Sequence, residues 1–193
     1  MDPNTLSEDG TVTANLSGAS PDGRYVVEVR NAAGSDWQEM RVLDLTTGES
    51  TGEVLEWVKF SGAAWVKDGF YYSRYPAPEG SAFSAENTFH SVYFHKVGTP
   101  QEQDELVFRN DNEPNRYHFA GATEDGRYVV LNTSTGTDGN ALHVMDREAD
   151  NPTWSPLVEG FKHHSSLVEH VQDKLYVLTD IGAPRYRLVC LLY

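Results

Sequence analysis

The sequence predicts an all-β protein, a β-propeller of about four blades with four antiparallel strands in each blade. The first observation behind this prediction is a phrase that recurs along the chain, reading SPDGRYVV at residues 20–27 and TEDGRYVV at residues 123–130. More degenerate copies stand at residues 66–73 and 171–178. The fourth positions of the four copies are separated by 46, 57 and 48 residues, a spacing typical of propeller blades.

The second observation is an independent register with the same period. The predicted third strands of the four units place Asp44, His95, Asp146 and Leu191 in equivalent slots, separated by 51, 51 and 45 residues. No segment shows a helical period over three turns. An immunoglobulin-like sandwich would also have short strands, but it would not repeat itself in this way, so the propeller is the favoured interpretation.

Within each unit the phrase itself predicts a hairpin. Asp-Gly suits a two-residue turn that demands positive φ angles, and the Tyr-Val-Val that follows suits a strand. In the first unit, residues 11–16 alternate as a strand should, and residues 16–19 lead into the hairpin. Residues 38–45 then predict a third strand, and residues 54–60 a fourth, outer one.

The same order predicts the remaining strands. In the second unit they are residues 63–65, 70–74, 91–96 and 105–108; in the third unit 119–122, 128–132, 141–146 and 153–158; in the last unit 166–170, 175–179 and 186–192. We therefore expect a single domain over residues 1–193, with approximate blades at residues 11–60, 61–110, 117–160 and 163–193. A loop rich in Pro, Gly and Ser at residues 75–88 accounts for the longest spacing.

Four blades raise the question of how the array closes, because an open arc leaves sheet edges bare. The last unit ends at its third strand, so residues 11–16 could supply its missing outer strand as a latch and close a small ring. Alternatively, two chains could pair as a homodimer.

Charge and cysteine content narrow the classes of partner. Fifteen basic and 29 acidic side chains give a net charge of −14, which argues against nucleic acid or an anionic membrane as partner. The acidic residues are scattered, as on a solvated surface. Cys190 is the single cysteine, which excludes an intrachain disulfide and a cysteine metal cluster. With no visible signal peptide or apolar membrane span, the sequence predicts a cytoplasmic protein, and it indicates no cofactor.

Several ordered motifs carry a resemblance to a known family. They include DPN at residues 2–4, GSDW at 34–37, VKFS at 58–61, VGT at 97–99 after His95, and YRL at 186–188. Through these the chain resembles the propeller domain of the prolyl oligopeptidases, serine peptidases that cut short peptides after proline. The likeness runs in order over essentially all 193 residues.

The resemblance implies that the propeller and the catalytic residues belong to different domains. In the family, a seven-bladed propeller caps an α/β-hydrolase domain that carries the Ser-Asp-His triad, and the propeller excludes large folded substrates. This chain holds only about four blades, and we expect no Gly-x-Ser-x-Gly nucleophile elbow in it and no catalytic residue. The implied partners are the hydrolase domain and short proline-containing peptides, and the chain alone should be inactive. It could be a fragment, an engineered protein, or a stand-alone interaction module whose loop at residues 75–88 binds a partner.

The resemblance also implies three substrate-binding residues. Phe60 in VKFS matches an aromatic residue that lines the substrate pocket, and Tyr117 and Thr137 fall in two further loops that approach the peptide. The alternative for Phe60 is core packing, and the alternative for Tyr117 is an ordinary loop aromatic.

Other candidate sites are weaker. His163, His164 and His170 could suggest a metal, but adjacent side chains of a strand point to opposite faces, so solvated histidines are favoured and no metal site is predicted. Residues 138–140 share only part of a calcium loop and favour a hairpin turn. The four tryptophans favour packing between blades over a stacking platform: Trp37, Trp57, Trp65 and Trp154.

Overall fold

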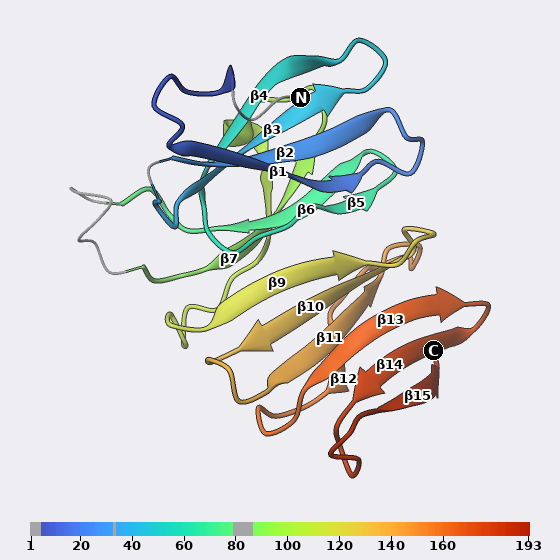
Figure 1. Ribbon diagram of the computed structural model, residues 1–193. Helices are drawn as coiled ribbons and strands as arrows, with labels where there is room; N and C mark the ends of the chain where they lie inside the picture. Colours follow the sequence, from blue (N-terminus) through green and yellow to red (C-terminus); the bar gives the residue numbers. More distant parts are fainter. Residues whose placement is uncertain (1–4, 33, 79–86) are drawn as a thin grey trace.

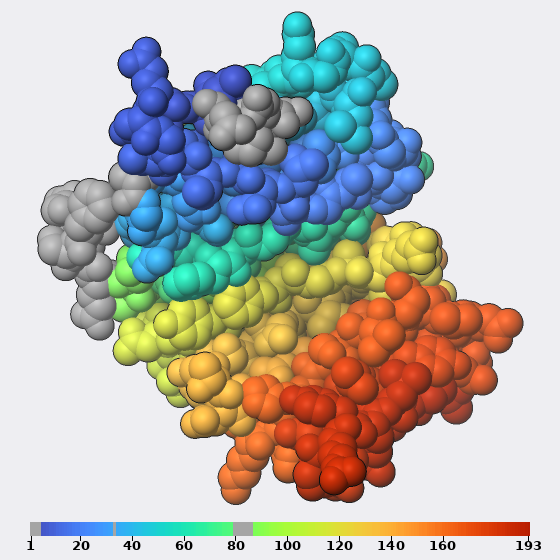
Figure 2. All heavy atoms as spheres, in the orientation of Figure 1, coloured from blue at the N-terminus to red at the C-terminus, as the bar shows by residue number. Residues whose placement is uncertain are grey.

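The computed structural model describes residues 5–32, 34–78 and 87–193 (Figure 1). The motif at residues 2–4 and most of the loop at residues 75–88 lie outside the described residues. Within them, short antiparallel sheets stack face to face along the chain. Figure 2 shows the units as successive layers, from blue at one end of the stack to red at the other.

The first two units share one sheet. The first consists of β1 (Val12–Ala19), β2 (Tyr25–Ala32), β3 (Gln38–Asp44) and β4 (Glu49–Val58). The second consists of β5 (Ala64–Val66), β6 (Gly69–Arg74), β7 (Ser91–Lys96) and β8 (Glu105–Phe108), with the short 3-10 helix η2 (Gln101–Gln103) before β8. A single pair, Val58 with Arg74, joins them into an eight-stranded sheet.

The remaining strands form two further sheets. The four-stranded sheet holds β9 (Tyr117–Ala122), β10 (Tyr128–Ser134), β11 (Asn140–Asp146) and β12 (Ser155–Val158). The three-stranded sheet holds β13 (Ser165–Val171), β14 (Lys174–Thr179) and β15 (Arg187–Leu192). The strands expected from the sequence all form, although several of them are longer than expected and β1 merges two expected segments.

Strand pairing confirms the repeat in both registers. Each third-strand residue identified by the period lies opposite an aromatic or leucine residue near the start of the second strand of its unit. The equivalent pairs are Tyr25 with Asp44, Phe70 with His95, Tyr128 with Asp146, and Leu175 with Leu191.

The turn chemistry differs from the expectation. Residues 20–24 separate β1 from β2, so the turn is longer than two residues, and only Gly23 has a positive φ, of 70°. The Asp22 carboxylate contributes through its side chain instead, accepting hydrogen bonds from Ser20 Oγ at 2.6 Å and from the Arg24 N–H at 3.0 Å. An Asx-type bond of this kind replaces the left-handed backbone that was expected at the aspartate.

The expected latch is not formed. Residues 12–16 belong to β1 and pair with β2, from Val12 opposite Ala32 to Leu16 opposite Glu28. A hairpin between neighbouring strands closes a much shorter loop than a contact with the far end of the chain, and its entropic cost is correspondingly lower. In Figure 1 the first unit and the β13–β15 sheet lie at opposite ends of the stack, and β15 is an edge strand.

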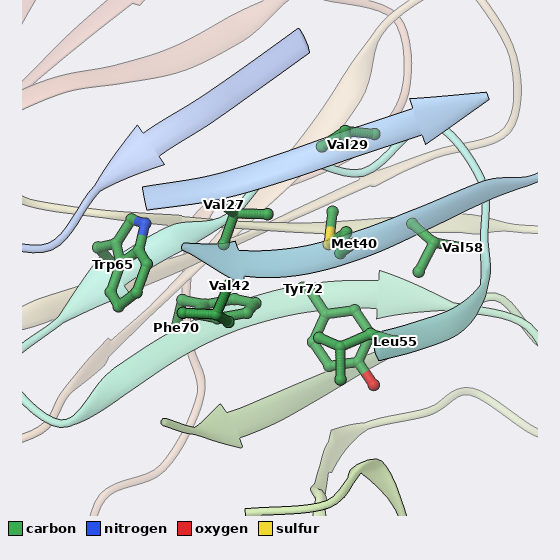
Figure 3. Packing of buried hydrophobic residues seen from close by; sticks show 9 residues of the cluster. All are labelled: Val27, Val29, Met40, Val42, Leu55, Val58, Trp65, Phe70 and Tyr72. Atoms are coloured by element: carbon green, nitrogen blue, oxygen red, sulfur yellow. The ribbon is translucent and has the colours of Figure 1, made fainter. Parts of the chain in front are cut away.

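The core lies between successive sheets. Figure 3 shows the cluster between the first and second units, in which Trp65 and Phe70 pack against valines of β2 and β3. A second cluster joins the second unit to the four-stranded sheet, with Trp154 at its margin, and a third lies between the last two sheets. The expectation of packing between blades is confirmed for Trp65 and Trp154.

Because successive strands alternate in direction, the connections fall at two ends of the stack. We call one the Asp-Gly end, since it holds the four turn phrases, and these turns lie on the right of Figure 1. We call the other the Phe60 end; it holds the β4–β5, β6–β7, β8–β9 and β10–β11 connections. Contacts between sheets agree with this: Arg116 stacks on Phe161 at the Phe60 end, and His170 contacts Asp125 at the Asp-Gly end.

Candidate functional site

Phe60 lies in the connection between β4 and β5, and 58% of its surface is exposed. Its φ is 55°, and that of Trp57 is 62°, so two bulky residues of one short segment adopt the left-handed region. The segment is held on both sides: the Tyr75 N–H donates to the Trp57 carbonyl at 3.0 Å, and the Ser73 N–H donates to Ser61 Oγ at 2.8 Å. The core-packing alternative for Phe60 is therefore wrong.

Left-handed aromatic residues gather at this end of the molecule. In residues 5–32, 34–78 and 87–193, five non-glycine residues have positive φ. Four of them are aromatic and lie at the Phe60 end, namely Trp57, Phe60, Phe89 and Tyr186; the fifth, Gln172, lies at the Asp-Gly end. Such conformations are unfavourable for bulky side chains and concentrate at functional sites, which makes the Phe60 end the candidate site.

His90 forms the centre of this end. It is only 1% exposed, and its Nδ1 accepts a hydrogen bond from the His118 N–H at 3.0 Å. Its ring centroid lies 4.7 Å from that of Tyr75, 5.1 Å from that of Phe119 and 6.0 Å from that of Tyr117. Burial lowers the pKa of His90 to about 4, against an opposing contribution from the Lys59 backbone, so the ring is neutral at pH 7.

Tyr117 is the first residue of β9 and is half-buried. Its ring lies nearly parallel to that of Phe119, with an interplanar angle of 8° and centroids 6.3 Å apart. Together with His90 and Tyr75 these rings form one aromatic array that crosses from the second unit to the four-stranded sheet. Tyr117 is thus part of a packed array, not an isolated loop residue.

Thr137 is exposed in the connection between β10 and β11. The end of this connection packs toward the β13–β15 sheet, because the Asn140 N–H donates to the His163 carbonyl at 2.9 Å and the Asn140 side chain bonds the Ser165 backbone. The structure thus brings the Phe60 segment and Tyr117 to a common neighbour, His90, whereas Thr137 stands further along the same end.

A cavity of about 500 Å³ opens on the outward face of the first unit, next to the Phe60 segment. Trp37 and Trp57 line it and meet edge to face with their centroids 5.7 Å apart. The Lys59 ammonium lies 4.3 Å from the centroid of Trp37, within the range of a cation–π contact. These two tryptophans therefore pack at the Phe60 end, and not in the core clusters that hold Trp65.

A buried network of charged groups links the first two units elsewhere. His95 Nδ1 lies 2.7 Å from Asp104 Oδ1, its Nε2 lies 3.8 Å from Glu53 Oε2, and the Tyr72 hydroxyl donates to Asp104 Oδ2 at 2.7 Å. Burial alone would lower the pKa of His95, but the hydrogen bond to Asp104 and the nearby Glu53 carboxylate outweigh it and raise that pKa to about 9. Burial and the Asp104 contact raise the pKa of the Tyr72 hydroxyl. At neutral pH this network is a charged connection between β4 and β7.

The sequence pattern of a nucleophile elbow is present after all, at residues 48–52, so the expectation that it would be missing is wrong at the level of the sequence. The geometry does not make it an elbow. Ser50 lies in β4 opposite Leu43 of β3, and its Oγ accepts a hydrogen bond from the Gly52 N–H at 3.2 Å. An elbow needs a strand followed directly by a helix, whereas β4 is a strand of an antiparallel sheet.

Two of the three histidines weighed as metal ligands pair with carboxylates. His163 Nδ1 lies 3.0 Å from Asp180 Oδ1, and His170 Nδ1 lies 2.6 Å from Asp125 Oδ2. In the part of the chain that the structure describes, no group of three or more His, Cys, Asp or Glu side chains is arranged to hold a metal ion. Residues 138–140 end a hairpin connection, as expected.

Sequence reasoning missed His90, Tyr75 and the Trp37–Trp57 pair. A usable signal existed: in an antiparallel meander, residues that follow one strand and precede the next share an end of the sheet. Tyr75 follows the second strand of its unit, and His90 precedes the third. The same rule would have placed both beside the Phe60 segment.

Stacked, twisted antiparallel sheets of this kind define a β-propeller domain. A family model described as the N-terminal β-propeller domain of prolyl oligopeptidase matches residues 1–191. The chain belongs to this family.

Comparisons with individual relatives support this family assignment. The prolyl endopeptidases of Elizabethkingia meningoseptica and Elizabethkingia miricola are 40% and 41% identical over 191 and 192 residues, which is 98% of this chain and 27% of each relative. Among solved structures, one from a study of two prolyl endopeptidases has a TM-score of 0.89 at 33% identity, covering 100% of this chain and 27% of the other. Prolyl oligopeptidase B from Galerina marginata, bound to a 25-residue macrocyclization substrate, has a TM-score of 0.89 at 27% identity, covering 98% and 29%. The chain thus spans little more than a quarter of the length of these relatives.

No helix in the described residues is long and apolar enough to cross a membrane.

Proposed function

We propose that this chain is the propeller portion of a serine peptidase of the prolyl oligopeptidase type, which cleaves short peptides after proline, and that its Phe60 end lines the peptide pocket. The observation that carries this proposal is Phe60 itself, an exposed aromatic side chain on a left-handed backbone that hydrogen bonds hold in place. A side chain of this kind presents apolar surface to a ligand at little further entropic cost, because the segment is already ordered.

In this proposal the catalytic groups belong to an α/β-hydrolase domain that faces the Phe60 end. The propeller contributes apolar and polar contacts through Phe60, Tyr117 and Thr137, and it acts as a steric filter. A short peptide can reach the nucleophile beside such a domain, whereas a folded protein cannot. The chain by itself should then be inactive. We place the peptidase in the cytoplasm, in keeping with the single cysteine of these 193 residues.

The test is a hybrid peptidase in which residues 1–191 replace the matching segment of the Elizabethkingia miricola prolyl endopeptidase. We expect F60A to raise the KM for a chromogenic proline-containing peptide by about tenfold with a smaller change in kcat, because it removes apolar contact area that the peptide buries. The matched control is L45A, which removes an apolar side chain of similar exposure at the Asp-Gly end. A KM for F60A equal to that of L45A would contradict the proposal.

A second candidate function is that of an interaction module that pairs with another copy of the chain. The observation in its favour is a row of exposed apolar side chains on the β13–β15 sheet: Val168, Leu178, Leu188 and Leu192. Light scattering distinguishes the two candidates, since the monomer has a mass of 21.5 kDa. A dimer that L188K converts to a monomer supports pairing, whereas a monomer at all concentrations excludes it. The loop at residues 75–88, the other candidate surface of such a module, lies mostly outside the described residues.

A further inference from the structure

We infer that His90 is a positioning residue for the peptide pocket, which fixes Phe60 relative to Tyr117. This inference rests on the proposed function, because it takes Phe60 and Tyr117 to be the residues that meet the peptide. The inference itself concerns a side chain that is only 1% exposed and that acts through its neighbours.

On one side, His90 supports the Phe60 segment. Its ring packs on Tyr75 with a centroid separation of 4.7 Å, and the Tyr75 N–H in turn holds the Trp57 carbonyl at 3.0 Å. The Lys59 backbone, directly before Phe60, is close enough to His90 to affect its pKa. Displacing the imidazole would therefore release a segment whose left-handed residues are unfavourable without such support.

On the other side, His90 supports the start of β9. Its Nδ1 accepts the His118 N–H at 3.0 Å, and its ring meets the rings of Phe119 and Tyr117. The His118 side chain is also held in place, because its Nδ1 lies 3.1 Å from Thr133 Oγ1. One imidazole thus connects the β4–β5 segment, the end of β6 and the start of β9, which belong to three different units.

The contacts at position 90 require a neutral ring that accepts one hydrogen bond, the one from the His118 N–H. The His118 N–H is buried, and a buried donor that loses its acceptor is destabilising. Phenylalanine would keep the ring packing but remove the acceptor, whereas asparagine can place its Oδ1 near the position of Nδ1. These two substitutions separate the positioning role of the hydrogen bond from simple filling of space.

The experiment is a double-mutant cycle in the hybrid peptidase described above, with KM and kcat for the chromogenic peptide as readouts. We expect H90F to raise KM by about fivefold with kcat changed less than twofold, and H90N to restore KM to within about twofold of the parent. In the F60A background, H90F should change KM by less than about twofold, because the contact through which His90 acts is already lost.

The outcomes separate the two claims. Equal KM values for H90F and H90N, or an H90F effect that adds fully to that of F60A, would overturn the role of His90 alone. An F60A variant indistinguishable from L45A would overturn the proposed function instead. Circular dichroism checks folding; if H90F does not fold, H90L replaces it, since it likewise removes the Nδ1 acceptor of the His118 N–H, and the same recovery in H90N and the same non-additivity with F60A are expected.

Discussion

The two ends of the stack are built from different chemistry. At the Asp-Gly end the same parts return from one unit to another: a hydroxyl bonded to the aspartate of the turn, and an arginine paired with the aspartate that ends the third strand. These parts are Ser20, Asp22, Arg24 and Asp44 in the first unit, and Thr123, Asp125, Arg127 and Asp146 in the third. The described residues of the Phe60 end show a different chemistry. Trp57, Phe60 and Phe89 are held in left-handed conformations around a neutral histidine.

We use this difference to distinguish scaffolding from the candidate site. A feature needed to build every unit recurs with the unit, whereas a feature needed once, to meet one ligand, does not. The recurring turn phrase therefore belongs to the construction of the blades. We assign the aromatic array around His90 to the candidate site.

The largest effect that can test this comparison lies in the turn region of the second unit. A Cβ added at Gly69 would lie 2.0 Å from the His95 carbonyl oxygen, so backbone would have to move. We expect G69A to lower the free energy of unfolding by about 3 kcal/mol or more, measured by urea denaturation. The control is G48A, at a φ of 77° with open space around it, which should cost about 1 kcal/mol. Equal losses of unfolding free energy in G69A and G48A would show that close packing does not determine the effect of a substitution at Gly69.

A smaller effect concerns two of the buried histidines, His90 and His95, whose pKa values are shifted in opposite directions. His95 has a folded pKa of about 9 and an ordinary value of 6.5, so its contribution to stability is fully present below pH 6.5 and is lost as the pH rises toward 9. We expect the free energy of unfolding to fall by up to about 3 kcal/mol over that range, and H95Q to remove most of the fall. H90N should leave it unchanged, because His90 is neutral throughout. A pH profile of H95Q that matched the parent would refute the account of the charged network.

The smallest effect should come from the recurring arginines. Arg127 and Arg24 pair with Asp146 and Asp44 at 2.8 and 3.2 Å, but both arginine side chains are substantially exposed to solvent. Water and salt screen such pairs, so R127A and R24A should each shift the urea midpoint less than G48A does, and should leave peptide hydrolysis by the hybrid enzyme unchanged. A large loss of peptidase activity in either variant would contradict the interpretation of the Asp-Gly end as scaffolding.

The sequence predicted the fold well because a meander is encoded locally. The period placed Asp44 and Asp146 in equivalent slots, and the structure pairs them with the equivalent residues Tyr25 and Tyr128. The latch failed as a prediction because residues 12–16 had an equally good and much nearer partner in β2. Strand pattern alone does not choose between partners; chain proximity does.

The site was predicted only in part. Phe60 was identified from its motif, but its exposure and left-handed backbone depend on Ser61, Ser73 and Tyr75 in three dimensions. His90 lies 28 residues from His118 in the chain, and no spacing rule connects them. Contacts between units, which create the aromatic array, are set by the stacking of sheets and not by the repeat.

The measurement that tests the central claim most directly is photo-crosslinking of a short proline-containing peptide, with a benzophenone at its N-terminal side, to the hybrid peptidase. If the Phe60 end lines the pocket, mass spectrometry should find the label in residues 57–61 and around Tyr117, and F60A should reduce it at both places. Labelling of the turns at residues 20–24, 123–127 or 172–173 in preference to these segments would contradict the account.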